Sequence, residues 1–169
     1  LRILVVGDIM LDHYIWGDAT RISPEAPVPV VSVMKDTDTV GGSANVALNL
    51  ATLGVNAELC GRIGHDNTAD AVRRIVDGNG ITFNNKLWSD ASIATIIKTR
   101  VIVQKQQLCR IDRENPAKDY TLDEERYLEY LKQQIKGASA VIASDYAKGA
   151  ISENVWNVLR ETTRDEGAL

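Results

Sequence analysis

The chain begins with Leu1-Arg2-Ile3-Leu4-Val5-Val6-Gly7-Asp8, and this opening is the strongest indication of its fold. Up to Val6 it places largely aliphatic side chains on both alternating faces, a pattern typical of a strand buried in a parallel sheet. A glycine and a carboxylate follow at once. Ligands of open α/β sheets collect just outside the carboxyl ends of the strands, so we expect a binding site beyond this strand.

The rest of the chain alternates between short apolar strands and amphipathic helices. We expect further buried strands at Asn56–Ile63 and Ala140–Ser144. We expect helices at Ser43–Leu53 and Asn67–Val76, one begun by a Thr121–Glu124 capping box, and one capped by Ser152 with Val155, Trp156 and Leu159 on one face. This alternation implies right-handed βαβ crossovers, and hence an α/β fold with a doubly wound, mostly parallel sheet.

Two segments fit that alternation badly. Pro27–Val33 is a β-branched run with two prolines, which predicts an edge strand. Ile93–Ile111 interleaves Ile, Val and Thr with Lys, Arg and Gln, as paired strands with one wet face do. We therefore expect a small second sheet beside the main one.

Composition limits the class of protein. The 169 residues suit one domain, and 44% hydrophobic and 25% charged residues are ordinary values for a globular chain. A net charge of −4 without a dense Lys/Arg cluster argues against nucleic acid and anionic membranes as partners. No apolar run approaches the roughly 18–20 residues of a membrane span. Cys60 and Cys109 are isolated, as free thiols in a reducing compartment are, so we expect a cytoplasmic protein without a metal site.

Two carboxylates, Asp8 and Asp12, stand just past the end of the first expected strand. Carboxylates accept hydrogen bonds from vicinal hydroxyl groups, so a polyol is a sensible ligand at this position. The alternative is a helix cap followed by a solvated turn, and the local pattern by itself favours that alternative.

A glycine pair opens the helix that follows, in Gly41-Gly42-Ser43-Ala44-Asn45. Paired glycines let the backbone approach a ligand closely, and the first helical turn presents unpaired N–H groups. Asn45 offers both a donor and an acceptor to a sugar hydroxyl. The stretch lacks the Lys and Ser/Thr of a Walker A loop and the later glycines of a dinucleotide fingerprint. A plain turn before a helix is the alternative.

Basic residues lie on the strands of the expected second sheet, at Lys98, Arg100 and Arg110. Alternating residues of a strand point to one face, and guanidinium groups bind phosphate bidentately. An ordinary wet strand face is an equally good interpretation of these charges alone.

In their order along the chain, these stretches resemble the first signature of the PfkB, or ribokinase-type, sugar kinases. The residues that carry this resemblance are Val5–Asp12, Gly41–Gly54 and Gly61–Asp66. Three further stretches look like the branch of the family that phosphorylates D-glycero-β-D-manno-heptose 7-phosphate, and these are Arg21–Val31, Gln106–Asp112 and Ser144–Gly149. The resemblance covers essentially the whole chain.

The resemblance implies a ribokinase-like fold with a small β lid, with lid strands near residues 15–34 and 93–112, which in many members also joins two subunits as a homodimer. The substrate-binding residues that it implies are Asp12, Gly41, Gly42, Asn45, Arg100, Arg110, Asp145 and Lys148. Among these, Asp12, Gly42 and Asn45 would hold sugar hydroxyls. Arg100 and Arg110 would reach the phosphate that the sugar-phosphate substrate already carries, and Lys148 would help there or at the transferred phosphoryl group.

The implied activity is transfer of a phosphoryl group from ATP, with Mg²⁺, to the anomeric hydroxyl of heptose 7-phosphate, a step towards ADP-heptose and the lipopolysaccharide core. The alternatives are another sugar kinase, such as a fructokinase, and a non-catalytic sugar-binding or dimerisation module. The family's Gly-Ala-Gly-Asp stretch, which supplies the catalytic base, does not occur in the 169 residues. We therefore expect the N-terminal part of a kinase domain, without a catalytic residue and inactive by itself.

Overall fold

Two four-stranded sheets organise the chain in the computed structural model, which describes residues 1–169 apart from the side chain of Asn85. The main sheet has the order β5-β4-β1-β8, and all of its strand pairs are parallel. Its strands are β1 (Arg2–Gly7), β4 (Asn56–Cys60), β5 (Thr82–Phe83) and β8 (Ala140–Ser144). The parallel sheet predicted from the opening stretch is therefore confirmed.

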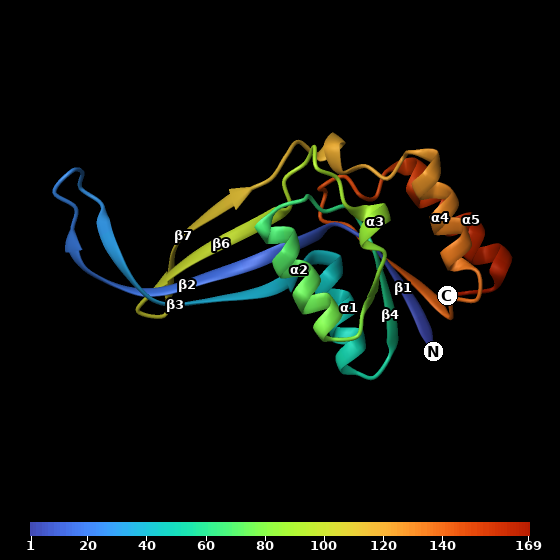
Figure 1. Ribbon diagram of the computed structural model, residues 1–169, viewed down its shortest axis with the longest axis horizontal. Coiled ribbons are helices and arrows are strands. Elements are labelled where there is room, and N and C mark those ends of the chain that lie inside the picture. The colour runs from blue at the N-terminus through green and yellow to red at the C-terminus, as the bar shows by residue number, and fades with distance from the viewer.

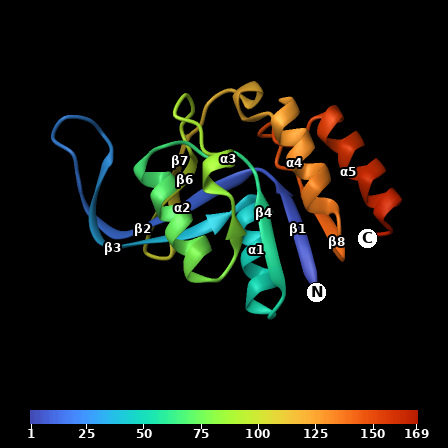
Figure 2. The same ribbon diagram turned by 45° about the vertical axis from the view of Figure 1, so that its right-hand side comes forward.

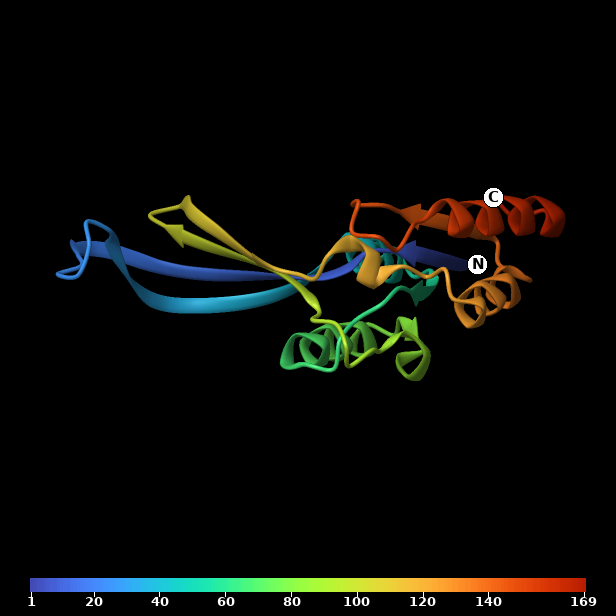
Figure 3. The same cartoon turned by 90° about the horizontal axis from the view of Figure 1, so that it is seen from above.

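The second sheet has the order β3-β2-β6-β7, which makes the proline-containing β3 an edge strand, as predicted. Its strands are β2 (Ile9–Ile22), β3 (Pro29–Gly41), β6 (Ile96–Val103) and β7 (Gln106–Arg113). β2 pairs antiparallel with β3 and parallel with β6, and β6 pairs antiparallel with β7. Figures 1 and 3 show this sheet as an arm that extends from the α/β body, with both chain termini at the opposite end.

Helices pack on both faces of the main sheet because neighbouring residues of a buried strand point to opposite sides. On one side, Ile3 and Val5 of β1 join a core with α1 and α2. On the other, Leu4 and Val6 join a core with α4 and α5, which lie side by side in Figure 2. The helices are α1 (Gly42–Thr52), α2 (Asn67–Gly78), α3 (Asn85–Trp88), α4 (Glu125–Ile135) and α5 (Glu153–Glu166), with a 3₁₀ helix, η1 (Ala117–Tyr120).

The second sheet is larger than the sequence pattern indicates. The polar stretch after Asp8 shows no strand period, yet it forms most of the 14-residue β2. β3 continues to Gly41, where the sequence indicates a turn. Most of β3 is exposed or only half-buried, so the pairing requires no regular alternation of apolar and polar residues.

The predicted capping box at Thr121 is wrong. Thr121 ends η1, and its Oγ1 accepts a hydrogen bond from the Asp123 backbone N–H at 3.2 Å, which closes a local turn. Helix α4 begins at Glu125, four residues after Thr121, with Glu124 as its N-cap and no side-chain capping bond. Because the chain forms η1 and a turn at Thr121, α4 begins only after the Thr121–Glu124 motif.

The last helix follows its predicted start and end but not its predicted apolar face. Ser152 Oγ accepts from the Val155 backbone N–H at 3.1 Å, and Gly167 ends α5 in the left-handed region at φ 67°. Val155 and Leu159 are buried, whereas Trp156 is 50% exposed. Adjacent helix positions are about 100° apart, so Trp156 is turned away from the face that its neighbour buries.

The state of the cysteines and the length of the helices can be compared with the expectations from composition. Both cysteines are free thiols, Cys60 buried and Cys109 exposed. No helix in the described part of the chain is long and apolar enough to span a membrane.

Candidate functional site

One pocket gathers most of the predicted site residues. It has a volume of about 510 Å³ and lies where the first turn of α1, the second sheet and the loop after β8 meet. It is lined by Met10, Asp12, Gly41, Gly42, Asn45, Lys98, Arg100, Arg110, Tyr146 and Lys148. Of the predicted substrate-binding residues, all but Asp145 are in this set. The fold thus brings together residues that are far apart in the sequence.

The glycine pair is required by two close approaches. Gly42 has a φ of +58°, and a Cβ at this position would lie 2.2 Å from the backbone oxygen of Asp8. A Cβ at Gly41 would lie 2.4 Å from Oδ2 of Asp12. No other residue fits at either position without displacing its neighbour. The pair therefore lets the start of α1 sit directly against the carboxylate of Asp12.

The first turn of α1 opens towards the pocket. Gly41 is its N-cap and makes no side-chain capping bond, and the turn contains no acidic residue. Asn45 is exposed on this turn and lines the pocket. The end of a helix with this polarity favours anionic or hydrogen-bond-accepting ligands.

Asp12 and Arg100 form an ion pair across the β2–β6 pairing. Arg100 Nη1 donates to Asp12 Oδ1 at 2.5 Å, and the guanidinium lies 5.3 Å from the centre of the Tyr14 ring. Burial acts to lower the pKa of Arg100, but the hydrogen bond and charge of Asp12 raise it above its ordinary value. Arg100 therefore stays charged and fixes the orientation of the Asp12 carboxylate.

A second cationic group lies on β6 and β7. Arg110 stands directly opposite Arg100 in the β6–β7 register. Asp112 accepts from Lys98 Nζ at 3.2 Å and pairs with Arg110 Nε at 2.9 Å. Burial acts to raise the pKa of Asp112, but Lys98 and Arg110 hold it below its ordinary value. Like charges opposite each other on paired strands are costly, so an anion between Arg100 and Arg110 would relieve their repulsion.

The loop after β8 supplies the remaining side of the pocket. Lys148 reaches the pocket from this loop, and its Nζ donates to Glu114 Oε1 at 2.6 Å. Asp145 does not line the pocket, because its Oδ1 accepts the Ala147 backbone N–H at 2.7 Å within the loop itself. Asp8 is 2% exposed and is also absent from the lining.

Two lining residues escaped the sequence-based prediction. Met10 precedes Asp12 by two positions, so the strand period places both on the same face of β2. Tyr146 stands between Asp145 and Lys148 and is 54% exposed. A period-2 argument could have found Met10, and the position of Tyr146 beside Lys148 could have drawn attention to it.

The charge of the pocket is opposite to that of the chain. Its lining carries four cationic side chains and one carboxylate, whereas the chain as a whole has a net charge of −4. Asp112 and Glu114 lie beside the lining and pair with three of these cations, so the site keeps an excess of one positive charge, which favours an anion. Within the described residues, no group of His, Cys, Asp and Glu side chains could hold a metal ion.

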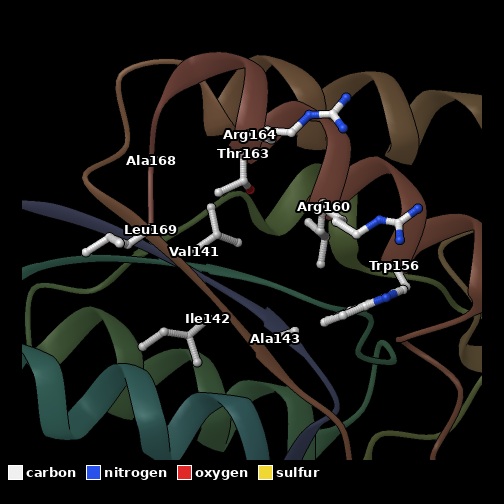
Figure 4. Close-up of a pocket in the computed structure, with 10 residues that line it drawn as sticks. Val141, Ile142, Ala143, Trp156, Arg160, Thr163, Arg164, Ala168 and Leu169 are labelled. Atoms are coloured by element: carbon white, nitrogen blue, oxygen red, sulfur yellow. The ribbon is translucent and has the colours of Figure 1, made fainter.

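A second pocket, of about 580 Å³, lies between β8 and α5 (Figure 4). Val141, Ile142 and Ala143 of β8 form one side, and α5 forms the other with residues such as Trp156 and Leu159. It contains none of the predicted site residues. The first pocket, which holds charged and amide side chains suited to a sugar phosphate, is therefore the candidate substrate site.

The family model of the pfkB carbohydrate kinases matches residues 1–168. The chain belongs to the pfkB family of carbohydrate kinases. The resemblance seen in the sequence motifs is thereby confirmed.

Curated relatives of this pfkB chain include bifunctional proteins named HldE. The chain is 41% identical to that of Magnetococcus marinus, over 98% of the chain and 34% of the relative. It is 45% identical to that of Shewanella amazonensis, over 90% of the chain and 31% of the relative. The chain thus spans about a third of the length of these relatives.

Solved structures show that the fold is ribokinase-like. A carbohydrate kinase from Agrobacterium tumefaciens matches with a TM-score of 0.75 at 20% identity, over 99% of this chain and 51% of that one. Arabidopsis thaliana ribokinase, solved with ribose and ATP, matches with a TM-score of 0.71 at 18% identity, over 98% and 51%. This chain spans about half of each solved structure.

Proposed function

We propose that this chain forms the acceptor side of a kinase that phosphorylates the anomeric hydroxyl of D-glycero-β-D-manno-heptose 7-phosphate. The observation that carries the proposal is the pocket itself, with four cations beside a carboxylate and an amide. A neutral sugar has no use for that much positive charge, whereas a sugar phosphate needs it. Membership of the pfkB family and the similarity to HldE proteins support the same choice.

The sugar would lie against Asp12, Gly42 and Asn45. Asp12 accepts hydrogen bonds from hydroxyl groups, and the Asn45 amide both donates and accepts. Arg100 already holds the carboxylate in place at 2.5 Å, so little side-chain freedom is lost when the sugar binds. This side of the pocket therefore orients the sugar ring.

The existing phosphate would lie among Arg100, Arg110 and Lys148. Two of these cations now pair with carboxylates beside the pocket, Arg110 with Asp112 and Lys148 with Glu114. Arg110 is half-exposed, and a guanidinium pairing through Nε keeps its Nη groups for a bidentate contact with phosphate. The phosphate thus fixes which end of the sugar faces the reaction centre.

ATP and Mg²⁺ would complete the reaction in the complete product of the gene. The described residues offer no ligand group suited to a metal ion, so we assign Mg²⁺ no ligand in this chain. Phosphoryl transfer also needs a base and in-line positioning. We therefore propose that residues 1–169 bind and orient the acceptor but do not transfer phosphate by themselves. As a separate proposal, which the isolated free cysteines support, we place the enzyme in the cytoplasm.

The test is an ATP-dependent phosphorylation assay with the complete product of the gene. Heptose 7-phosphate should be converted to a 1,7-bisphosphate with a far higher kcat/KM than fructose, fructose 6-phosphate or unphosphorylated heptose. Residues 1–169 alone should show no turnover in the same assay. Preference for an unphosphorylated sugar would favour a fructokinase-like enzyme, and binding without turnover by the complete product would favour a sugar-binding module.

A further inference from the structure

The buried carboxylate of Asp8 has no role in the proposed binding mode, yet three backbone N–H groups converge on it. Oδ2 accepts from Tyr146 at 2.8 Å and from Lys148 at 3.1 Å, and Oδ1 accepts from Ala150 at 2.9 Å. All three donors belong to the loop after β8. Asp8 therefore spans this loop and ties it to the end of β1, almost 140 residues earlier in the chain.

Asp8 also contacts the glycine turn on the other side of the pocket. Its backbone oxygen accepts from the Ser43 N–H at 2.9 Å, and its backbone N–H donates to Ser144 at 3.2 Å. The close approach of Gly42 to the same oxygen leaves no room for a side chain. One residue thus joins the start of α1, which carries Asn45, to the loop that carries Tyr146 and Lys148.

The loop is held in a conformation that it would not adopt alone. Ala147 has a φ of +57°, which a residue with a side chain rarely adopts. Gly149 has a φ of +111°, and a Cβ there would lie 1.9 Å from the Ala117 backbone oxygen. The conformation of Ala147 is costly unless surrounding contacts fix it, whereas Gly149 adopts its φ without strain and marks a position where only glycine fits. The three bonds to Asp8 supply those contacts.

We infer that Asp8 is a positioning residue, which holds the loop after β8 so that Lys148 and Tyr146 face the substrate pocket. It acts through the backbone and touches no substrate. The inference rests on the proposed function only for the choice of substrate in the kinetic test below. The structural part of the inference is that the buried Asp8 carboxylate fixes the positions of the lining residues Tyr146 and Lys148.

The first measurement is hydrogen exchange of the wild-type complete product, which requires no substitution. Tyr146 is 54% exposed and lies outside any helix or strand, so its amide should exchange quickly unless the bond to Asp8 protects it. We expect slow exchange at Tyr146, Lys148 and Ala150 in the wild type. In Asp8→Asn one acceptor oxygen becomes an NH2 group, so exchange should become fast at Ala150 or at the pair Tyr146 and Lys148, while β1 and β4 stay protected. Fast exchange of the three amides in the wild type would overturn the inference.

The second measurement is a double-mutant cycle with Lys148→Ala. Asp8→Asn should raise KM for heptose 7-phosphate about tenfold, the factor expected for loss of one charge-assisted hydrogen bond. Once Lys148 is removed, Asp8→Asn should add little, because the two changes remove the same contact. Multiplied effects in the double variant would contradict the inference.

Ser152→Ala is the matched control for stability. It removes the N-cap of α5, two residues after Ala150, without touching the bonds to Asp8. Its melting temperature should fall while KM and the exchange of the Tyr146 amide stay at wild-type values. If the wild type phosphorylates no sugar phosphate, the proposed function fails, and the exchange result still decides the role of Asp8.

Discussion

At the scale of single residues, Asp12 and Asn45 define the sugar-binding side of the pocket. Replacing Asp12 with Asn, or Asn45 with Ala, should remove one hydrogen bond to a sugar hydroxyl and cost about 1–3 kcal/mol. We expect kcat/KM for the sugar to fall by about 5- to 150-fold. The Michaelis constant for ATP should change little, and steady-state kinetics of the complete product measure both.

Asp38→Asn is the control for that pair of variants. Asp38 also lies on the second sheet, where it pairs with His13 at 2.6 Å, but it does not line the pocket. Its substitution should leave the sugar kinetics unchanged. If Asp12 serves only to pair with Arg100, Asp12→Asn will lower stability and leave the kinetics of the folded enzyme normal, which would defeat the assignment.

The sequence predicted the role of a residue where a steric or electrostatic requirement restricts which residue type can occupy the position. Gly41 and Gly42 were predicted to let the backbone approach a ligand, and the structure shows that they make room for the Asp12 carboxylate and the Asp8 backbone oxygen. The burial of Asp8 could not be predicted, because its three hydrogen-bond donors lie almost 140 residues away and have no side-chain signature. The sequence pattern is the same for a buried carboxylate that accepts backbone hydrogen bonds and for a carboxylate that binds a ligand.

At the scale of elements, the second sheet exposes apolar side chains that a monomer has no reason to keep. On β2, β3 and β7 the exposed fractions are 39% for Trp16, 59% for Val33, 70% for Met34 and 47% for Leu108. Several large exposed apolar side chains on an extended arm are typical of an interface. We propose that the second sheet joins two copies of the protein.

Sedimentation equilibrium of the complete product tests the proposed dimer. The wild type should be dimeric, and a Met34→Asp, Leu108→Asp double variant should be monomeric, because charges would be buried unpaired in the interface. Leu53→Asp is the control, since Leu53 is 79% exposed but lies at the end of α1, outside the second sheet. A monomeric wild type, or dissociation by Leu53→Asp as well, would contradict the proposal.

Elements were predictable where burial imposes a period. β1, β4, α1 and α2 each bury residues in a core, and the sequence indicates each of them. The strand predicted at Ala140–Ser144 is present, but β8 is an edge strand and its first four residues are only half-buried, so the prediction that it is buried was wrong. β2 and β3 are mostly outside the core, so their pairing leaves little trace in the order of polar and apolar residues. The start of α4 was misplaced because the hydroxyl of Thr121 closes a turn after η1 instead of capping the helix.

At the scale of the whole molecule, the α/β body and the arm contribute different halves of one binding site. The body supplies Gly42, Asn45 and Lys148, and the arm supplies Asp12, Arg100 and Arg110. The order of the motifs along the chain predicted the family. The fold then brings these six residues, which are far apart in the sequence, to one pocket. The sequence alone could not show that Arg100 would pair with Asp12, since that contact depends on the parallel β2–β6 register.

We propose that this pocket recognises a phosphate that the sugar already carries. The most direct test is the ratio of kcat/KM for heptose 7-phosphate to that for unphosphorylated heptose, in the complete product and in its Arg110→Ala variant. A charge-assisted hydrogen bond to phosphate contributes roughly 1.5–3 kcal/mol, so the variant should lower the ratio by about 10- to 150-fold. Turnover of unphosphorylated heptose should stay nearly unchanged. Equal losses for both sugars, or no loss for either, would contradict the phosphate site.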